Sequence, residues 1–302
     1  MKNLYKYFAI LFSVIIIAGC DKPDAIVLEP DIDNSDKVEI EVLTSDPESE
    51  ISKGMDSTGT IEEYIRFTNY IAVSGIKITD NSVTTNISTA QAIFFDRTIP
   101  YFDLNNRLIG FRARSIGNVK FNDVNANLVP FKVRFKDRNG VRDTTLGFQH
   151  LLYKGRGNHS DPFDFIYNSS ISFSLDPFLG NNVTFGIPTP HEITGTLSIS
   201  RNIVNNRLHA SLTWNHFSEG NIEIVIGAKR RNLNSTIPLY RIKTPDDGSL
   251  VIPPGLINSI PPDRFNNLVI SLIRKYEGYH ETNGNQLFVR SQSIHSIAVE
   301  IP

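Results

Sequence analysis

The chain has 302 residues, of which 40% are apolar and 10% aromatic, so it contains enough hydrophobic material to build a folded core. Its formal net charge of −2 conceals an asymmetry, because residues 21–57 hold twelve Asp and Glu against three Lys while residues 58–302 carry a net charge of +5. A single cysteine, Cys20, excludes an internal disulfide. The composition therefore indicates a mildly basic body that follows an acidic segment.

The first 19 residues have the layout of a secretory signal peptide. Lys2 and Lys6 precede an apolar run over residues 8–19, and charged residues follow Cys20 directly. The run is shorter than the roughly 20 residues that a membrane-spanning helix needs. We therefore predict a signal peptide over residues 1–19 and not a transmembrane anchor.

Cys20 ends the motif Ile17-Ala-Gly-Cys20, which resembles the lipobox of bacterial lipoproteins. The resemblance implies cleavage before the cysteine, a diacylglycerol on its thiol and acylation of the new N-terminus, with palmitate as an acyl chain. It implies a lipid-anchored protein of the cell envelope, in the outer membrane on its periplasmic or surface-exposed face, with the lipid bilayer as a partner. Acylation also removes the unpaired thiol that an exported protein would otherwise carry.

Residues 20–60 are predicted to form a lipid-anchored acidic linker. Polar and acidic residues dominate the segment, so it buries too little apolar surface to offset the entropy cost of ordering. Repulsion among its carboxylates favours an extended chain that holds the body away from the lipid. Within it, Val38–Leu43 alternates apolar and acidic residues like a half-buried strand. This segment could form an edge strand of the body or remain loose, and we favour the loose alternative.

Residues 61–190 are predicted to form an N-terminal β-rich domain. Strand patterns cover Ile87–Phe95, Val119–Phe121, Phe131–Phe135, Leu146–Tyr153 and Ile166–Leu175. The residues from Phe131 to Lys136 alternate between apolar and basic, which places the two kinds on opposite faces of a strand. Asp137–Gly140 supplies a hairpin turn after it. The stretch Pro177–Pro190, which ends in Ile187-Pro-Thr-Pro190, is predicted to be a linker.

Residues 191–302 are predicted to form a C-terminal β-sandwich. The strand patterns lie at Gly195–Ser200, Arg207–Trp214, Asn221–Ala228, Pro238–Lys243, Ser249–Ile252, Asn267–Lys275 and Gln286–Glu300. Seven strands in about 110 residues are typical of an immunoglobulin-like sandwich. Only Pro254–Ile260 and Ile61–Tyr70 have the pattern of short helices. We therefore predict an all-β protein with two β-sandwich-like domains behind a disordered N-terminal stalk.

Two resemblances accompany this fold class. Arg207–Trp214 resembles the second strand of a fibronectin type III-like domain, in which a tryptophan at the strand's end fills the core. The body resembles uncharacterised exported lipoproteins of Bacteroidota, with landmarks at Ala90–Phe94, Ile116–Val119, Ser198–Arg201 and Thr244–Pro253. The resemblance implies a C-terminal fibronectin type III or immunoglobulin-like domain in the cell envelope, and it implies no particular reaction.

Two polar clusters are candidates for a binding site. Pro245–Gly248 could offer paired carboxylates to a cation or a sugar, or form a tight turn, and we favour the turn because Asp-Gly suits chain reversal. Asp161–Asp164, together with Lys154, Arg156 and His159, could line a ligand pocket or form an exposed charged loop. We favour the loop.

No catalytic or metal-binding motif is present in the sequence. The seven histidines (150, 159, 191, 209, 216, 280 and 295) lack the spacing of a zinc site. The Gly-x-Ser-x-Gly motif of serine hydrolases is absent. We therefore predict no catalytic residue, no metal and no cofactor, although two carboxylates that meet only on folding, as in glycosidases, leave no sequence motif.

Basic residues recur in the body, at Arg112, Arg114, Lys120, Lys132, Arg134, Lys136, Arg138 and Lys229–Arg231. They could attract a polyanionic glycan or a lipid headgroup, or they could form the solvent faces of strands, and we favour the second alternative. Nucleic acid is not expected as a partner outside the cell. Asp56–Thr58 and Asp143–Thr145 also resemble the short acceptor motif for O-glycosylation in Bacteroidota.

The sequence favours a non-enzymatic role. Our first hypothesis is a binding or adhesion module for a glycan or another envelope component, such as a partner protein. It predicts a shallow, groove-like site with aromatic residues at strand ends, but the sequence nominates no ligand-binding residue. The alternatives are a structural or assembly subunit of an envelope complex and, least favoured, a hydrolase.

Overall fold

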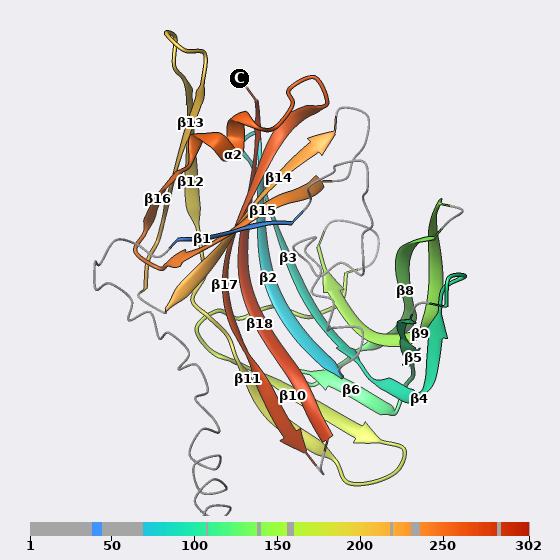
Figure 1. Cartoon of the computed structure of the whole chain (residues 1–302). Helices are drawn as coiled ribbons and strands as arrows, with labels where there is room; N and C mark the ends of the chain where they lie inside the picture. The colour runs from blue at the N-terminus through green and yellow to red at the C-terminus, as the bar shows by residue number, and fades with distance from the viewer. Residues whose placement is uncertain are drawn as a thin grey trace, which may run out of the picture. The chain divides into compact units, whose positions relative to one another are not determined.

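A computed structural model of the chain describes residues 38–43, 69–106, 108–137, 140–155, 160–217, 220–230, 236–282 and 285–301 (Figure 1). Strands account for 70% and helices for 2% of the described residues, so the predicted all-β fold class is confirmed. The predicted signal peptide, Cys20 and most of the acidic linker lie outside the described residues. The expected helix at Ile61–Tyr70 also lies outside them, except that Tyr70 begins a strand.

The largest sheet contains eleven strands. Ten follow the order β1-β15-β14-β17-β18-β2-β3-β9-β5-β4, and β8 pairs with β9 beside them. Their bounds are β1 Glu39–Val42, β2 Tyr70–Asp80, β3 Val83–Ile93, β4 Phe95–Phe102, β5 Leu108–Ala113, β8 Asn127–Asp137, β9 Gly140–Lys154, β14 Asn221–Arg230, β15 Thr236–Pro245, β17 Phe265–Thr282 and β18 Asn285–Glu300. The parallel pair of β18 and β2 joins the two predicted halves in one sheet. The domain boundary between residues 190 and 191 stays a prediction.

Two smaller sheets pack on this large one. A four-stranded sheet has the order β11 (Val183–Pro188), β10 (Ser170–Pro177), β6 (Gly117–Phe121) and β7 (Val124–Asn125). A three-stranded sheet has the order β12 (Gly195–Arg201), β13 (Leu208–Trp214) and β16 (Ser249–Ile252). The short helix α2 (Pro254–Asn258) follows β16, within the segment predicted to be helical.

Each small sheet shares a hydrophobic core with a different part of the large sheet. The three-stranded sheet packs against β14, β15 and β17, and this core includes Leu212, Trp214, Ile224, Ile242 and Leu272. The four-stranded sheet packs against β2, β3, β9 and β18, and this core includes Val73, Ala90, Leu152, Phe173 and Leu287. Both arrangements are β-sandwich-like, because two sheets bury their apolar faces against each other.

Period-two alternation predicted the buried faces correctly. In β13, Leu208, Ala210, Leu212 and Trp214 are buried while His209 is exposed on the opposite face. In β10, Ile171, Phe173 and Leu175 are buried as expected. In β8, Phe131 and Val133 are buried and Lys132 is exposed, and the side chains of residues 134–136 lie outside the described ones. Asp137 pairs with Gly140, which confirms the β8–β9 hairpin, although residues 138 and 139 of its turn are not described.

The linker predicted at Pro177–Pro190 is wrong. This stretch contains β11, which pairs with β10 from Ser170–Pro188 to Leu175–Val183. Ile187 is 1% exposed and belongs to the core under the four-stranded sheet. The prolines suggested a linker because proline has no N–H to donate within a sheet. They are compatible with β11, however, because at the end of an edge strand no inter-strand hydrogen bond is lost.

The preference for a loose Val38–Leu43 segment is also wrong. Residues Glu39–Val42 form β1, which pairs antiparallel with β15 at the edge of the large sheet. Arg241 of β15 binds Glu41 at 3.0 Å, and Val38 and Leu43 pack against two hydrophobic clusters. A strand of four residues is stable only when it pairs with another strand. The alternating pattern therefore predicts a strand here only because β15 offers an open sheet edge.

A buried ion pair lies where the chain crosses from the four-stranded to the three-stranded sheet. Arg274 of β17 and Asp246, which follows β15, have side chains that are 1% and 0% exposed, and Nη2 and Oδ2 are 2.8 Å apart. The Arg274 guanidinium also donates to the carbonyl oxygens of His191, Glu192 and Asn215. The Nε1–H of Trp214 donates to Asp246 Oδ1 at 2.8 Å. The ion pair therefore joins β17, the core tryptophan and the crossing segment.

Two β18 side chains hold the same crossing segment, Thr189–Gly195. The Ile193 N–H donates to Ser293 Oγ at 2.8 Å, and the Gly195 N–H donates to His295 Nδ1 at 2.9 Å. Ser293 and His295 are buried. Their hydrogen bonds satisfy backbone groups that would be costly to bury without partners, so they fix where β12 begins.

Replacement of Asp246 by Ala leaves the buried Arg274 guanidinium without its counter-ion. We expect D246A to lower the free energy of unfolding by about 3–5 kcal/mol, as for other buried pairs that lose one partner. Asp164→Ala serves as the control, because Asp164 forms an exposed ion pair with Lys154 and should cost less than about 1 kcal/mol. Urea denaturation followed by Trp214 fluorescence measures both, and equal losses would contradict the structural role of the buried pair.

Candidate functional site

The Pro245–Gly248 cluster is a turn, as favoured from the sequence. Gly248 has a φ of +96°, and the Asp247 carboxylate accepts the Ser249 N–H at 3.2 Å. Asp246 points instead into the protein, where Arg274 and Trp214 bind it. The two carboxylates therefore do not converge on a ligand.

The Asp161–Asp164 cluster forms a charged loop whose carboxylates are engaged locally. Asp161 accepts hydrogen bonds from the Tyr153 N–H at 2.8 Å and from Asn127 Nδ2 at 2.9 Å. Lys154 and Asp164 form an exposed ion pair at 2.6 Å. Arg156 and His159 lie outside the described residues, so the described part of the cluster consists of Asp161, Asp164 and Lys154.

The histidines are scattered, and the described residues contain no cluster of metal-ligating side chains. His150 and His295 are buried, and desolvation lowers the pKa of each. His191 stacks on Phe217, and His280 stacks on Phe185. His280 also lines a cavity.

The described basic residues lie on separate strands: Arg112 on β5, Lys120 on β6 and Lys132 on β8. Lys132 is exposed on a strand face, as expected, whereas Arg114 is paired with Asp96 at 2.9 Å. The side chains of Arg134, Lys136, Arg138, Arg230 and Arg231 lie outside the described ones. Asp143–Thr145, one of the two glycosylation-like motifs, lies in β9, and the other is not described.

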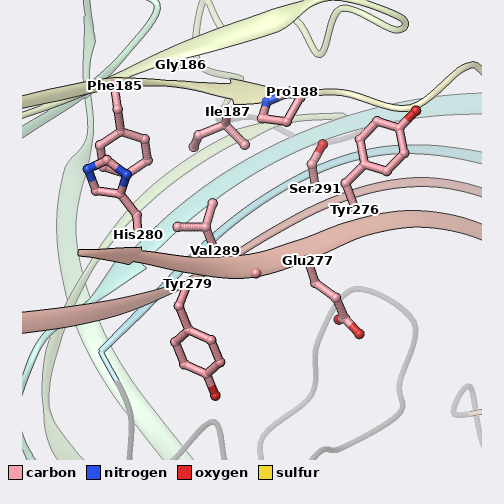
Figure 2. A pocket seen from close by; sticks show the side chains of 11 residues that line it. Phe185, Gly186, Ile187, Pro188, Tyr276, Glu277, Tyr279, His280, Val289 and Ser291 are labelled. Carbon is pink, nitrogen blue, oxygen red and sulfur yellow. The ribbon is translucent and has the colours of Figure 1, made fainter.

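The best candidate site is a groove between β11, the C-terminal part of β17 and the N-terminal part of β18 (Figure 2). It encloses about 230 Å³. Its lining comprises Phe185, Gly186, Ile187, Pro188, Tyr276, Glu277, Gly278, Tyr279, His280, Val289 and Ser291. The lining is largely apolar and aromatic with a few polar groups, which is the usual composition of a ligand site.

Strand alternation decides which side chains enter the groove. Tyr276 and His280 of β17 point toward β11, and Glu277 and Tyr279 point away from it (Figure 2). The His280 ring stacks on Phe185, with centroids 3.8 Å apart and planes 21° apart. This stacked pair closes one end of the groove, and Tyr276, which is 36% exposed, lies toward the other.

Gly278 and Ser291 form the floor between these ends. A Cβ atom added to Gly278 would meet no atom within 4 Å, so the glycine leaves space that a ligand group can occupy. Ser291 is 1% exposed, and its Oγ has no hydrogen-bond partner among the described residues. A buried hydroxyl without a partner is costly, and a ligand donor or acceptor would satisfy it.

Two open strand edges run along the groove. β11 is the outermost strand of the four-stranded sheet. β14 pairs with β17 only as far as Ile273, so β18 is the one strand partner of residues Glu277–Glu281 in the described part of the chain. Each edge presents backbone N–H and C=O groups that an added strand could pair with.

The described lining of the groove contains a single carboxylate. Glu277 carries it, and this side chain lies on the opposite face of β17. Arg290 binds it at 2.9 Å and Lys275 at 3.0 Å. A glycosidase needs two carboxyl groups that flank its substrate, and the described lining of this groove has no such pair.

Sequence reasoning missed this site because it ended the strand too early. The predicted strand stopped at Lys275, whereas β17 continues to Thr282. The available signal was the run Tyr276-Glu-Gly-Tyr-His280, in which a glycine interrupts an aromatic-rich strand. Such a glycine indicates a bulge or a close approach to another group.

No family model, curated protein or solved structure matches this chain. Among the described residues, no helix is long and apolar enough to cross a membrane.

His295 makes stability depend on pH. Burial lowers the pKa of His295 below its usual value of 6.5, and the Lys77 ammonium adds to the effect while Glu192 opposes it. The unfolded chain therefore binds more protons than the native protein once the pH falls below about 6.5. We expect the free energy of unfolding to fall from about pH 7.5 to pH 5.5, and to fall less in His295→Asn, whose amide oxygen can still accept the Gly195 N–H. Urea denaturation at the two pH values tests this, and an equal decrease in both proteins would contradict it.

Proposed function

We propose that this protein is a lipid-anchored, non-catalytic binding module of the cell envelope, and that its ligand occupies the groove between β11 and β17. The lipobox-like motif at Cys20 supports the anchor. The C-terminal half supports an immunoglobulin-like module, because β12-β13-β16 faces β15-β14-β17-β18 across a core that contains Trp214. The groove has the aromatic residues near strand ends that a binding module would use.

The ligand that suits this groove is an extended segment of a partner protein. The observation that carries this proposal is the pair of open strand edges, β11 and residues Glu277–Glu281 of β17, on either side of one groove. Strand addition supplies backbone hydrogen bonds, and pockets for alternate side chains supply specificity. One ligand side chain would fill the space above Gly278, and a polar group beside it would bind Ser291 Oγ.

A glycan is the alternative ligand, and the ring geometry favours it less. Sugar recognition would use exposed aromatic faces, but His280 stacks on Phe185 and Phe173 packs against the same ring with centroids 5.0 Å apart. Among the groove aromatics this leaves Tyr276 as the exposed ring on the ligand side. A structural subunit remains the second alternative, and a broad apolar sheet face would be its mark.

Filling the space above Gly278 should block the ligand without unfolding the protein. Gly278 lies in an ordinary strand conformation with open space above it, so Gly278→Val fits the strand and occupies the groove. We expect peptides selected from a random linear library on the native protein to bind Gly278→Val at least about tenfold more weakly, a difference of 1.4 kcal/mol. Isothermal titration calorimetry measures the affinity.

Gly255→Val is the matched control. Gly255 also has no atom within 4 Å of an added Cβ, but it lies in α2 and does not line the groove. The control should bind the selected peptides like the native protein. A glycan array tests the alternative. If glycans bind the native protein and no peptide does, and if Gly278→Val weakens that binding, the groove ligand is a sugar and not a peptide.

Replacement of Cys20 by Ser tests the anchor. Without the thiol no diacylglycerol can be attached, so we expect C20S to lose metabolic labelling by a radioactive fatty acid and to be retained less strongly in the membrane fraction. Membrane fractionation and autoradiography measure the two effects. Unchanged labelling of the variant would show that Cys20 is not the acylated residue.

A further inference from the structure

The hairpin of β12 and β13 ends in two aliphatic side chains that contact almost nothing. Ile203 is 98% exposed and Val204 is 95% exposed. β16 pairs with β13 only from Ala210 to Thr213, so the outer part of the hairpin extends beyond the third strand (Figure 1). Two adjacent exposed aliphatic residues at a projecting tip form a small apolar patch that is available to a partner.

Several backbone N–H groups of this tip are already hydrogen-bonded within the hairpin. The Asn202 N–H donates to the Arg207 carbonyl at 2.8 Å, and Asn202 Oδ1 accepts the Val204 N–H at 2.9 Å. The Arg207 N–H donates to Asn205 Oδ1 at 3.1 Å. Paired N–H groups enter a medium of low polarity at a smaller free-energy cost than unpaired ones.

The charge within the hairpin has one sign. Arg201 and Arg207 flank the aliphatic pair and are both exposed, and no Asp or Glu occurs between Ile193 and Phe217. The Arg201 side chain bonds Asn206, which places its guanidinium beside the turn. An aliphatic tip between two arginines is complementary to an anionic lipid surface, where arginine binds headgroup phosphates.

We propose that the β12–β13 tip is a membrane-contact site that inserts Ile203 and Val204 into an anionic bilayer, with Arg201 and Arg207 at the headgroups. Two side chains are far smaller than the roughly 800 Å² per partner of a stable protein interface. They match the shallow burial of interfacial elements, which enter the boundary by about 5–10 Å. This contact is independent of both the groove ligand and the acylation of Cys20.

A tryptophan at the tip reports insertion directly. The full chain carries Cys20→Ser, to remove acylation, and Ile203→Trp, with Trp214 as a constant buried background. With vesicles of phosphatidylcholine that contain phosphatidylglycerol, we expect a blue shift of the new tryptophan and its protection from acrylamide. A tip that stays quenchable while the chain sediments with these vesicles would overturn the proposal.

Two sets of variants separate the tip from general surface hydrophobicity. Ile203→Ser with Val204→Ser should reduce vesicle affinity at least about tenfold relative to the C20S chain. Phe178→Ser with Leu179→Ser is the matched control, because this pair is 70% and 91% exposed in the β10–β11 turn and has no neighbouring arginine or lysine. Equal losses in both would contradict a specific tip.

The arginines are tested by lipid composition. Arg201→Gln with Arg207→Gln should abolish the preference for anionic over pure phosphatidylcholine vesicles, since the charge attraction falls with each cation removed. A retained preference would contradict their role at the headgroups. Circular dichroism melting checks that each variant is folded. Sedimentation velocity without vesicles tests whether the tip binds a second copy of the chain. Dimers that disappear in the tip variants would assign the tip to that contact instead.

Discussion

Arg274 lies in the interior of the protein, where its charge must be balanced and its N–H groups must find acceptors. Asp246 balances the charge, and carbonyl oxygens of His191, Glu192 and Asn215 accept the remaining hydrogen bonds. These partners come from the β15–β16 turn, the segment that enters β12 and the segment that follows β13. One guanidinium thus holds together the two layers of the C-terminal sandwich and the chain that leads into it.

The groove follows from how far β17 and β18 extend past this point. Near Leu272 and Val299 the two strands pack against the three-stranded sheet, and near His280 and Leu287 they lie against the four-stranded sheet. The pairing of β14 with β17 ends at Ile273, next to the buried arginine. Beyond it, β17 has an open edge close to the open edge of β11, and the absence of a side chain at Gly278 keeps the space between them available.

Local patterns predicted much of the fold and little of the site. The alternation in Arg207–Trp214 and Ile171–Leu175 placed each buried side chain correctly, because one face of a strand packs on a core whatever the distant partner is. The same reasoning failed at Val38–Leu43 and Pro177–Pro190, where a short or proline-flanked segment becomes a strand only beside a particular edge. It also assigned Asp246 to a turn and could not foresee Arg274, 28 residues away, as its partner.

The all-β class, the strand faces and the lipobox-like motif at Cys20 follow from the sequence alone, since each depends on residues that are neighbours in the chain. That strands from both halves share one sheet, and that β11 lies beside β17, became visible with the folded structure. It alone brought Phe185 onto His280, with Ser291 and Gly278 between the strands. Phe185 and His280 are 95 positions apart, and Tyr70 and Phe288, which pair between β2 and β18, are 218 apart. Such pairings depend on the packing of whole sheets, which no local pattern encodes.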